Sequence, residues 1–153
     1  WSTRAIRRTK PDQAPRTSGK QTSSVTDPQP PRPSLRLQTV NIDCADARAM
    51  AAFYGKLLGW EITWDDGDFI LMRDPGDGAG LSFQEIPNYR PPVWPEQPDG
   101  QDKMLHLEIK VDDLDAAVAH ALACGGRLAD FQGRDDLRVV LDPAGHPFCL
   151  FTA

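Results

Sequence analysis

Two ionisable side chains, His106 and Glu108, stand two residues apart in the segment 105–111. Apolar and polar residues alternate through this segment, which predicts a half-buried strand with one polar face. On such a strand both side chains project from the same face, so they could work as acid and base or hydrogen-bond a small ligand. A solvated polar face that binds nothing fits the same pattern, and the sequence leaves the two interpretations open.

A second polar set comes earlier in the chain. Thr39 and Asn41 alternate with apolar residues in the segment 37–44, and Gln84 lies in another short apolar run. These three side chains are predicted to share a ligand-binding cleft with His106 and Glu108.

Trp94 is the last predicted contact of the cleft and lies in a proline-rich stretch. A loop aromatic has little core to join, so Trp94 could cover the cleft or pack against a second chain. It could equally plug the edge of a sheet.

An internal repeat supplies the elements that must position these residues. Sliding the first half of the folded region by 67 positions places Asp46 on Asp113 and Gly59 on Gly126. Each aspartate is expected to begin a helix as its N-cap, and each glycine to follow the end of that helix. Each half then reads as strand, helix and three strands, and the two modules cover residues 37–86 and 104–153, with a linker over 87–103.

Hydrophobic spacing gives the elements of each module. In the first module the predicted elements are a strand over 37–44, a helix ending at 58, and strands over 60–64, 69–73 and 81–86. In the second they are a strand over 105–111, a helix from 114 to about 124, and strands over 127–131, 137–141 and 148–151. Trp60 and Trp64 alternate on one strand and are expected in the core rather than in contact with a ligand.

The predicted fold class is α+β. A βαβββ unit of about fifty residues is too small to bury a core alone, so the two modules should pair. Their strands would then form a curved mixed sheet around a cleft, with the helices outside. The whole folded domain is expected to cover residues 35–153.

Charge divides the chain into two parts. The formal net charge is −5, from 17 Lys and Arg against 22 Asp and Glu. The first 36 residues carry eight basic and two acidic side chains, and few large apolar ones. Residues 1–34 are therefore predicted to be a disordered basic tail rich in Pro, Ser and Thr, which could dock the domain elsewhere. An acidic body argues against nucleic acid as a partner, and no apolar run is long enough for a membrane span.

The remaining cysteines and histidines receive mostly structural interpretations. Cys44, Cys124 and Cys149 form no CxxC pair, which favours three thiols in a reducing cytoplasm. Cys149 could instead be a reactive thiol, although a buried small side chain is the favoured reading. His120 is expected to be exposed, and His146 to be a turn residue.

Several local motifs resemble one known superfamily. Tandem βαβββ modules, together with Phe53-Tyr54 and Leu57-Leu58-Gly59-Trp60, resemble the vicinal oxygen chelate superfamily of glyoxalases, bleomycin-resistance proteins and dioxygenases. The stretches 111–114 and 142–148, VDDL and DPAGHPF, are similar to its second helix start and final hairpin. Residues 83–85 and 91–95 resemble its small actinobacterial glyoxalase-like branch. The resemblance covers residues 37–153.

The resemblance also implies four metal-ligand positions. Enzymes of this superfamily bind a divalent metal with His, Gln or Glu from the first and last strands of each module. The corresponding residues here are Thr39, Ser82, His106 and Cys149, of which only His106 has a usual ligand type. We therefore expect no metal at the family position. A divalent ion held by His106, Glu108 and Cys149 is a less favoured alternative.

These observations predict a glyoxalase-like protein that binds a small molecule, without a cofactor. The alternative is a lyase, isomerase or dioxygenase of the same fold, either metal-dependent or using His106 and Glu108 as acid and base. The sequence leaves open whether the chain is an enzyme, which ligand it takes and whether it forms a homodimer.

Overall fold

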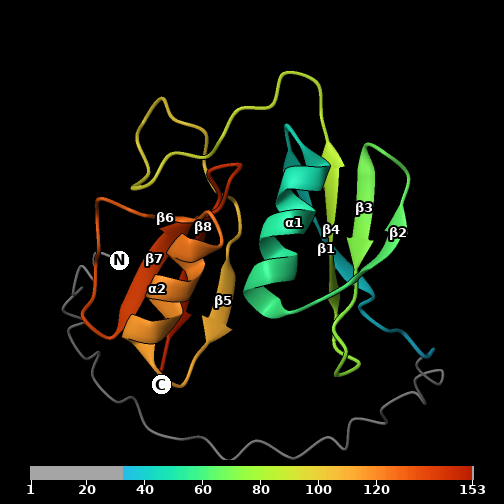
Figure 1. Cartoon of the computed structure of the whole chain (residues 1–153). Helices are drawn as coiled ribbons and strands as arrows, with labels where there is room; N and C mark the ends of the chain where they lie inside the picture. Colours follow the sequence, from blue (N-terminus) through green and yellow to red (C-terminus); the bar gives the residue numbers. More distant parts are fainter. Residues whose placement is uncertain (1–32, 153) are drawn as a thin grey trace, which may run out of the picture. The chain divides into compact units, whose positions relative to one another are not determined.

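The computed structural model describes residues 33–152 and contains two βαβββ modules (Figure 1). The first module comprises β1 (Thr39–Cys44), α1 (Ala47–Leu58), β2 (Ile62–Asp65), β3 (Phe69–Met72) and β4 (Gly80–Glu85). The second comprises β5 (Leu107–Lys110), α2 (Leu114–Ala123), β6 (Arg127–Leu128), β7 (Leu137–Leu141) and β8 (Pro147–Phe151). The predicted α+β class and the order of elements are confirmed, whereas the predicted tail over 1–34 falls almost wholly outside the described residues.

Each module contains a four-stranded mixed sheet with the same topology. The strand order is β1-β4-β3-β2 in the first module and β5-β8-β7-β6 in the second, with the first and last strands of each module parallel. Asn41 pairs with Ser82, and Glu108 pairs with Cys149. Both partners of the first pair are separated from those of the second by 67 positions, so the register reproduces the repeat seen in the sequence.

Aspartate caps begin both helices as predicted. The carboxylate of Asp46 accepts a hydrogen bond from the backbone N–H of Ala49, and Asp113 accepts one from Ala116. Gly59 ends α1 in the left-handed conformation, with a φ of 71°, which a residue without a Cβ adopts at little cost. The caps fix where each helix starts and therefore which of its faces meets the sheet.

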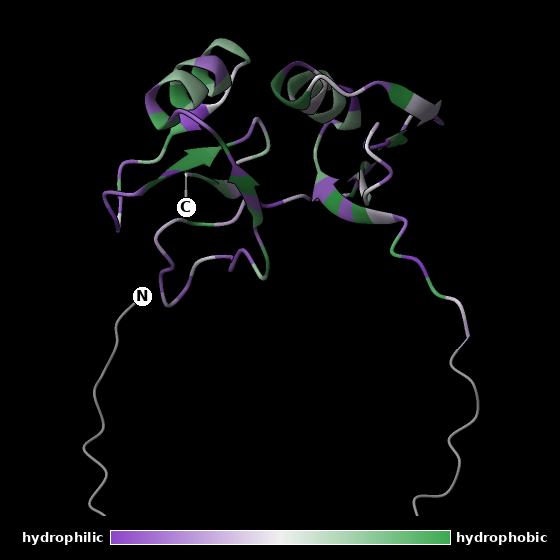
Figure 2. Cartoon of the chain, turned by 90° about the horizontal axis from the view of Figure 1, so that it is seen from below, coloured by the Kyte–Doolittle hydropathy of each residue, from purple (hydrophilic) through white to green (hydrophobic). Residues whose placement is uncertain are grey.

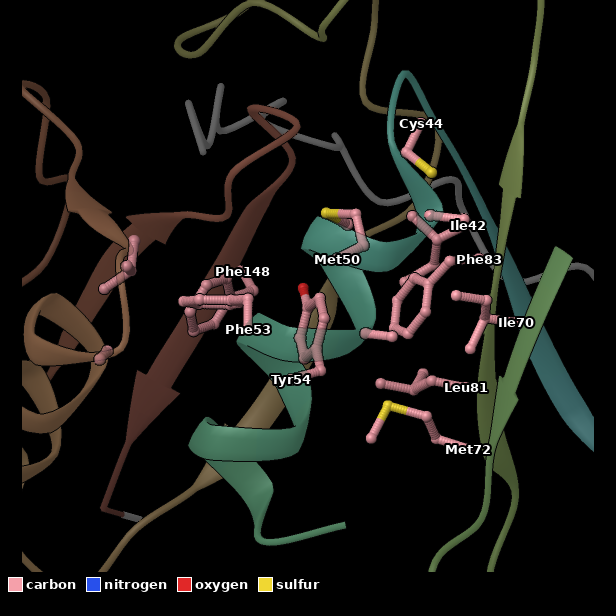
Figure 3. Packing of buried hydrophobic residues seen from close by; sticks show 14 of the residues in the cluster. Ile42, Cys44, Met50, Phe53, Tyr54, Ile70, Met72, Leu81, Phe83 and Phe148 are labelled. Carbon is pink, nitrogen blue, oxygen red and sulfur yellow. The ribbon is translucent and has the colours of Figure 1, made fainter. Parts of the chain in front are cut away.

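The buried core lies between the helices and the sheets. Green and purple alternate along the helices in Figure 2, because each presents an apolar face to the core and a polar face to solvent. Figure 3 shows Tyr54 of α1 between Phe83 of the first module and Phe148 of the second, with Phe53 beside Phe148. One core cluster thus contains residues from both modules, in agreement with the expectation that neither module buries a core alone.

Two expectations about side chains and strand lengths are wrong. Trp60 is half-buried against the core, but Trp64 is 59% exposed. The pairing of β2 with β3 shifts register between Ile62 and Trp64, which turns Trp64 to the face opposite the helix. The predicted strand over 127–131 also ends early, at Leu128.

Among residues 33–152, neither helix is long and apolar enough to cross a membrane.

Candidate functional site

The structure brings His106 and Glu108 together with Cys149. His106 Nε2 lies 2.9 Å from Glu108 Oε1, and the ligand atoms of the three residues lie within 4.8 Å of one another. The predicted strand over 105–111 begins only at Leu107, so His106 directly precedes β5 and Glu108 lies on it. The two side chains are thus near neighbours along the chain, and the parallel pairing of Glu108 with Cys149 adds the thiol. Burial raises the pKa of the Cys149 thiol, as does the nearby Glu108 carboxylate, whereas Lys103 opposes the change.

The polar residues of the first module form a separate hydrogen-bond network. Ser82 is fully buried, donates to Asn41 Oδ1 at 2.9 Å and lies 3.4 Å from the Thr39 hydroxyl. Asn41 also donates to Gln84 at 3.2 Å. The predicted contacts Thr39, Asn41 and Gln84 therefore lie together on β1 and β4, and their mutual bonds fix the orientation of the Asn41 amide.

The four family metal positions do not fit a divalent ion. Two of them, Thr39 and Ser82, supply neutral hydroxyls, and the Ser82 hydroxyl is already engaged by Asn41 and Thr39. Such oxygens are poor substitutes for the carboxylate and imidazole ligands that hold a labile metal. The first module therefore contributes no usual ligand to a metal held across the two modules.

A pocket of about 440 Å³ lies between the edge strands β1 and β5 and the linker. Asn41 lines it from β1, and His106 lines it from the position just before β5. Its apolar lining residues are Ile42, Ile86, Pro92, Met104, Leu105, Leu107 and Pro147; its polar ones are Asn41, Asp43, Tyr54, Asn88, Tyr89, Arg90, Gln101, Asp102, Lys103, His106 and His146. Sequence reasoning missed the contribution of the linker, because irregular segments give no periodic signal.

Trp94 does not line that pocket. It packs against a cluster on the open face of the second sheet that includes Val139 and Cys149, and its indole N–H donates to the Phe131 carbonyl at 3.1 Å. The Lys103 ammonium lies 4.7 Å from the Trp94 ring centroid, within the range of a cation–π contact. Trp94 thus packs on the second sheet of its own chain, and its role as a ligand contact stays a prediction.

A buried network that the sequence did not reveal joins the two modules. The Tyr54 hydroxyl donates to Asp142 Oδ2 at 3.0 Å, and the other carboxylate oxygen accepts from the backbone N–H groups of Ala144 and His146. His146 Nε2 lies 2.7 Å from the Asp43 carbonyl, which requires the proton to be on that nitrogen. His146 thus holds its turn in place, as predicted, and also contacts β1.

Asp142 is expected to make stability depend on pH. Burial raises the pKa of this carboxyl in the folded protein, although the hydrogen bonds that it accepts oppose the change. A raised folded-state pKa means that protonation stabilises the fold: the stabilisation is complete below about pH 4 and is lost as the pH rises through the raised value. The unfolding free energy of the wild type minus that of Asp142→Asn should therefore increase between pH 7 and 4 in urea titrations. A difference that shrinks would contradict this prediction.

The three cysteines are expected to differ in reactivity. Cys44 is completely buried, and desolvation raises the pKa of its thiol to about 11. Cys149 is 8% exposed with a raised pKa, whereas Cys124 is only partly buried. Because the thiolate is the reactive form, a disulfide reagent should modify one thiol rapidly in the native protein and all three after unfolding. The fast phase should disappear in Cys124→Ser; its persistence would show that another thiol is accessible.

Comparisons with known proteins agree with this architecture. A family model described as a glyoxalase-like domain matches residues 39–151. A glyoxalase/bleomycin resistance protein/dioxygenase family enzyme from Burkholderia phytofirmans is 21% identical, with a TM-score of 0.58 over 77% of this chain and 98% of that one. A glyoxalase-related enzyme from Fulvimarina pelagi is 18% identical, with a TM-score of 0.56 over 77% and 88% of the chains.

The trypanothione-dependent glyoxalase I of Leishmania major is also similar, at 18% identity and a TM-score of 0.54 over 78% and 87% of the two chains. No curated protein matches the sequence significantly. At these identities the solved structures establish a shared fold rather than a shared reaction. The family model covers both modules and the linker, and on that basis the chain belongs to the glyoxalase-like family of the vicinal oxygen chelate superfamily.

Proposed function

We propose that this domain binds a small organic molecule in the pocket between β1 and β5, without the metal ion used by enzymes of its superfamily. The main observation in support is the pocket itself, whose volume of about 440 Å³ lies within the range of small-molecule sites. Its lining combines apolar side chains with polar groups from both modules and the linker. An apolar or aromatic compound with one or two polar groups suits such walls.

The polar groups at the pocket would orient the ligand. The Asn41 amide is held by Ser82 and Gln84, so it presents a fixed donor and acceptor. Arg90 also lines the pocket, and among residues 33–152 its guanidinium has no ion-pair partner. A carboxylate or carbonyl oxygen of the ligand could therefore bind the Arg90 guanidinium at low cost, since no existing ion pair must be broken.

Leu105 provides a direct test of the pocket. Its side chain lines the pocket yet is 57% exposed, so Leu105→Trp should narrow the pocket without disturbing the core. Leu122→Trp is the matched control, because Leu122 is an exposed leucine on α2 that does not line the pocket. The probe is 8-anilinonaphthalene-1-sulfonate, an aromatic anion whose fluorescence rises in apolar sites, and native mass spectrometry of purified protein would reveal any compound retained.

Binding of the probe should weaken at least about tenfold in Leu105→Trp, which corresponds to about 1.4 kcal/mol, and should not change in Leu122→Trp. Treatment with a metal chelator should leave the affinity of the probe unchanged. Equal binding by the wild type and Leu105→Trp would exclude the pocket, and loss of binding with the chelator would contradict the metal-free proposal.

An enzyme of the same fold is the second candidate, and the His106–Glu108 contact favours it. At 2.9 Å the carboxylate can fix the ring orientation of His106, which also lines the pocket, as an acid/base residue requires. Once a ligand is identified, incubating the protein with an excess of it would distinguish a binding protein from an enzyme. A binding protein leaves the ligand chemically unchanged. An enzyme converts it to product, and His106→Gln should lose most of the rate of conversion.

A further inference from the structure

We infer that the pocket between β1 and β5 selects a small zwitterion with an apolar side group, of which an aromatic amino acid is the type. The Arg90 guanidinium would bind the carboxylate of this ligand, and the carboxylates of Asp43 and Asp102 would bind its ammonium group. All three residues line the pocket. The inference rests on the proposed function and adds the charge class of the ligand to it.

Some of the charged and imidazole side chains that line the pocket are already engaged within the protein. The Lys103 ammonium contacts the Glu96 carboxylate, and His106 Nε2 lies 2.9 Å from Glu108 Oε1. His146 Nε2 donates to a backbone carbonyl at 2.7 Å. A ligand would have to compete with these contacts, so Lys103, His106 and His146 are poor candidates for its main charge partners.

The remaining charged side chains of the lining are Arg90, Asp43 and Asp102. Within the described range 33–152, none of the three has an ion-pair partner, and all three are exposed. A ligand that is only an anion would meet two unpaired carboxylates, and one that is only a cation would meet the unpaired guanidinium. A ligand with both charges complements all three groups.

Two of these charges come from the two stems of the linker. The Val93 N–H donates to the Gln101 carbonyl at 2.8 Å and so joins the stems to each other. Arg90 precedes this bond on one stem, and Asp102 follows it on the other. The guanidinium and the carboxylate therefore come from adjacent segments. Opposite charges attached to one carbon atom, as in an amino acid, suit such an arrangement.

Asp43 adds a second carboxylate from β1. Asn41 and Asp43 are two positions apart on this strand, and both line the pocket. Burial is the main cause that raises the pKa of the Tyr89 hydroxyl, and the charge of Asp43 contributes, so this carboxylate faces the linker. The unpaired groups of the lining thus carry more negative than positive charge, which favours a ligand that brings an ammonium group with its carboxylate.

Exposed apolar side chains line the same pocket. Met104, Leu105 and Ile86 are 87%, 57% and 37% exposed. An apolar side group that covers them removes apolar surface from water, which favours binding. A zwitterion without a side group, such as glycine, leaves this surface exposed, so both the charges and the apolar group are needed for the full affinity.

The backbone at Met104 is strained where it borders the pocket. Its φ of 55° lies in the left-handed region, which residues other than glycine rarely adopt. The Leu105 N–H donates to the Lys103 carbonyl at 2.5 Å, which is the hydrogen bond of a γ-turn, and γ-turns with a positive φ are rare. Strained turns are concentrated at ligand-binding sites, so this turn supports the assignment of the pocket to a ligand.

The test compares three probes that share a phenyl ring and differ in their charged groups. L-Phenylalanine carries both charges near neutral pH, 3-phenylpropionate only the carboxylate and 2-phenylethylamine only the ammonium group. Calorimetry with the full chain at low salt should show L-phenylalanine binding at least about threefold more tightly than either of the others. Glycine should bind at least about tenfold more weakly than L-phenylalanine, because it lacks the apolar group.

Substitutions at the pocket should change affinity according to the charge of the probe. Arg90→Gln should weaken binding of L-phenylalanine and 3-phenylpropionate at least about threefold and should not weaken binding of 2-phenylethylamine. A double variant, Asp43→Asn with Asp102→Asn, should weaken binding of L-phenylalanine and 2-phenylethylamine and should not weaken binding of 3-phenylpropionate. All three positions are exposed, so the variants should fold as the wild type does.

Matched controls carry the same substitutions away from the pocket. Arg127→Gln is compared with Arg90→Gln, and the double variant Asp66→Asn with Asp130→Asn is compared with the double variant at the pocket. Arg127, Asp66 and Asp130 are exposed and do not line the pocket. The controls should therefore bind every probe as the wild type does.

Three results would overturn the inference: L-phenylalanine binding no more tightly than 3-phenylpropionate, a loss in Arg90→Gln that is equal for all three probes, or equal losses in the control variants. Failure of the pocket itself differs, because 8-anilinonaphthalene-1-sulfonate would then bind the wild type and Leu105→Trp equally. If that dye binds at the pocket but L-phenylalanine is not preferred, the zwitterion is rejected and the pocket stands.

Discussion

A Tyr54→Ala variant is expected to have a free energy of unfolding about 4 kcal/mol below that of the wild type. The Tyr54 ring stacks on Phe83 of the first module at a centroid distance of 5.3 Å and lies 6.2 Å from Phe148 of the second. Its hydroxyl donates to the buried Asp142 carboxylate. Truncation therefore opens a cavity between the modules and removes a hydrogen bond from a buried charged group.

Two further variants separate these contributions in urea or thermal unfolding. Tyr54→Phe keeps the ring and should cost about 1–3 kcal/mol, the range for a buried acceptor that loses its donor. Lys56→Ala changes an exposed position two residues further along α1 and should stay within about 0.5 kcal/mol of the wild type. If Tyr54→Ala cost no more than Lys56→Ala, the modules would not be held together by this residue.

Local signals account for most of what the sequence predicted about the fold. The Asp46 and Asp113 caps, the left-handed Gly59 and the alternating strands each depend on residues a few positions apart, and each is confirmed. The repeat extended this reasoning to strand pairing, because equivalent positions of two similar modules occupy equivalent places in their sheets. Low sequence identity between the halves does not matter, since cap and turn residues carry the pattern.

The exposure of Trp64 was not predictable from alternation alone. A period of two assigns Trp60 and Trp64 to one face only if the strand is regular, and the shift between Ile62 and Trp64 breaks that regularity. No residue in the segment identifies the shift in advance. It arises where β2 pairs with β3 at the edge of the sheet.

Only part of the candidate site was predictable from the sequence. His106 and Glu108 lie close together because they are two positions apart in the chain, the first just before β5 and the second on it. Cys149 lies beside them because β8 pairs with β5. Contacts between Tyr54 and Asp142, or between Trp94 and the second sheet, join residues far apart in the chain. Periodicity carries no information about such contacts, so the linker's share of the pocket became visible only in three dimensions.

A Gly80→Ala variant is expected to lose about 3 kcal/mol of unfolding free energy, the upper part of the range for overpacking. A Cβ at this position would lie 2.2 Å from the backbone oxygen of Met72 and 3.3 Å from the Cα of Arg73. Both obstacles are backbone atoms of the adjacent segment, so no side-chain rotation relieves the clash. Strand β4 would have to move at its start, where Gly80 pairs with Thr39 and donates to the Gln38 carbonyl.

Gly133→Ala is the matched control, because the nearest atom to its new Cβ is Phe131 Cε1 at 3.6 Å, an ordinary contact. That variant should stay within about 0.5 kcal/mol of the wild type. Movement of β4 would also displace Ser82, which fixes the Asn41 amide at the pocket, so Gly80→Ala should weaken binding of the fluorescent probe even where the protein remains folded. Equal stability and equal probe binding in the two alanine variants would show that the close approach of β3 and β4 does not position the pocket.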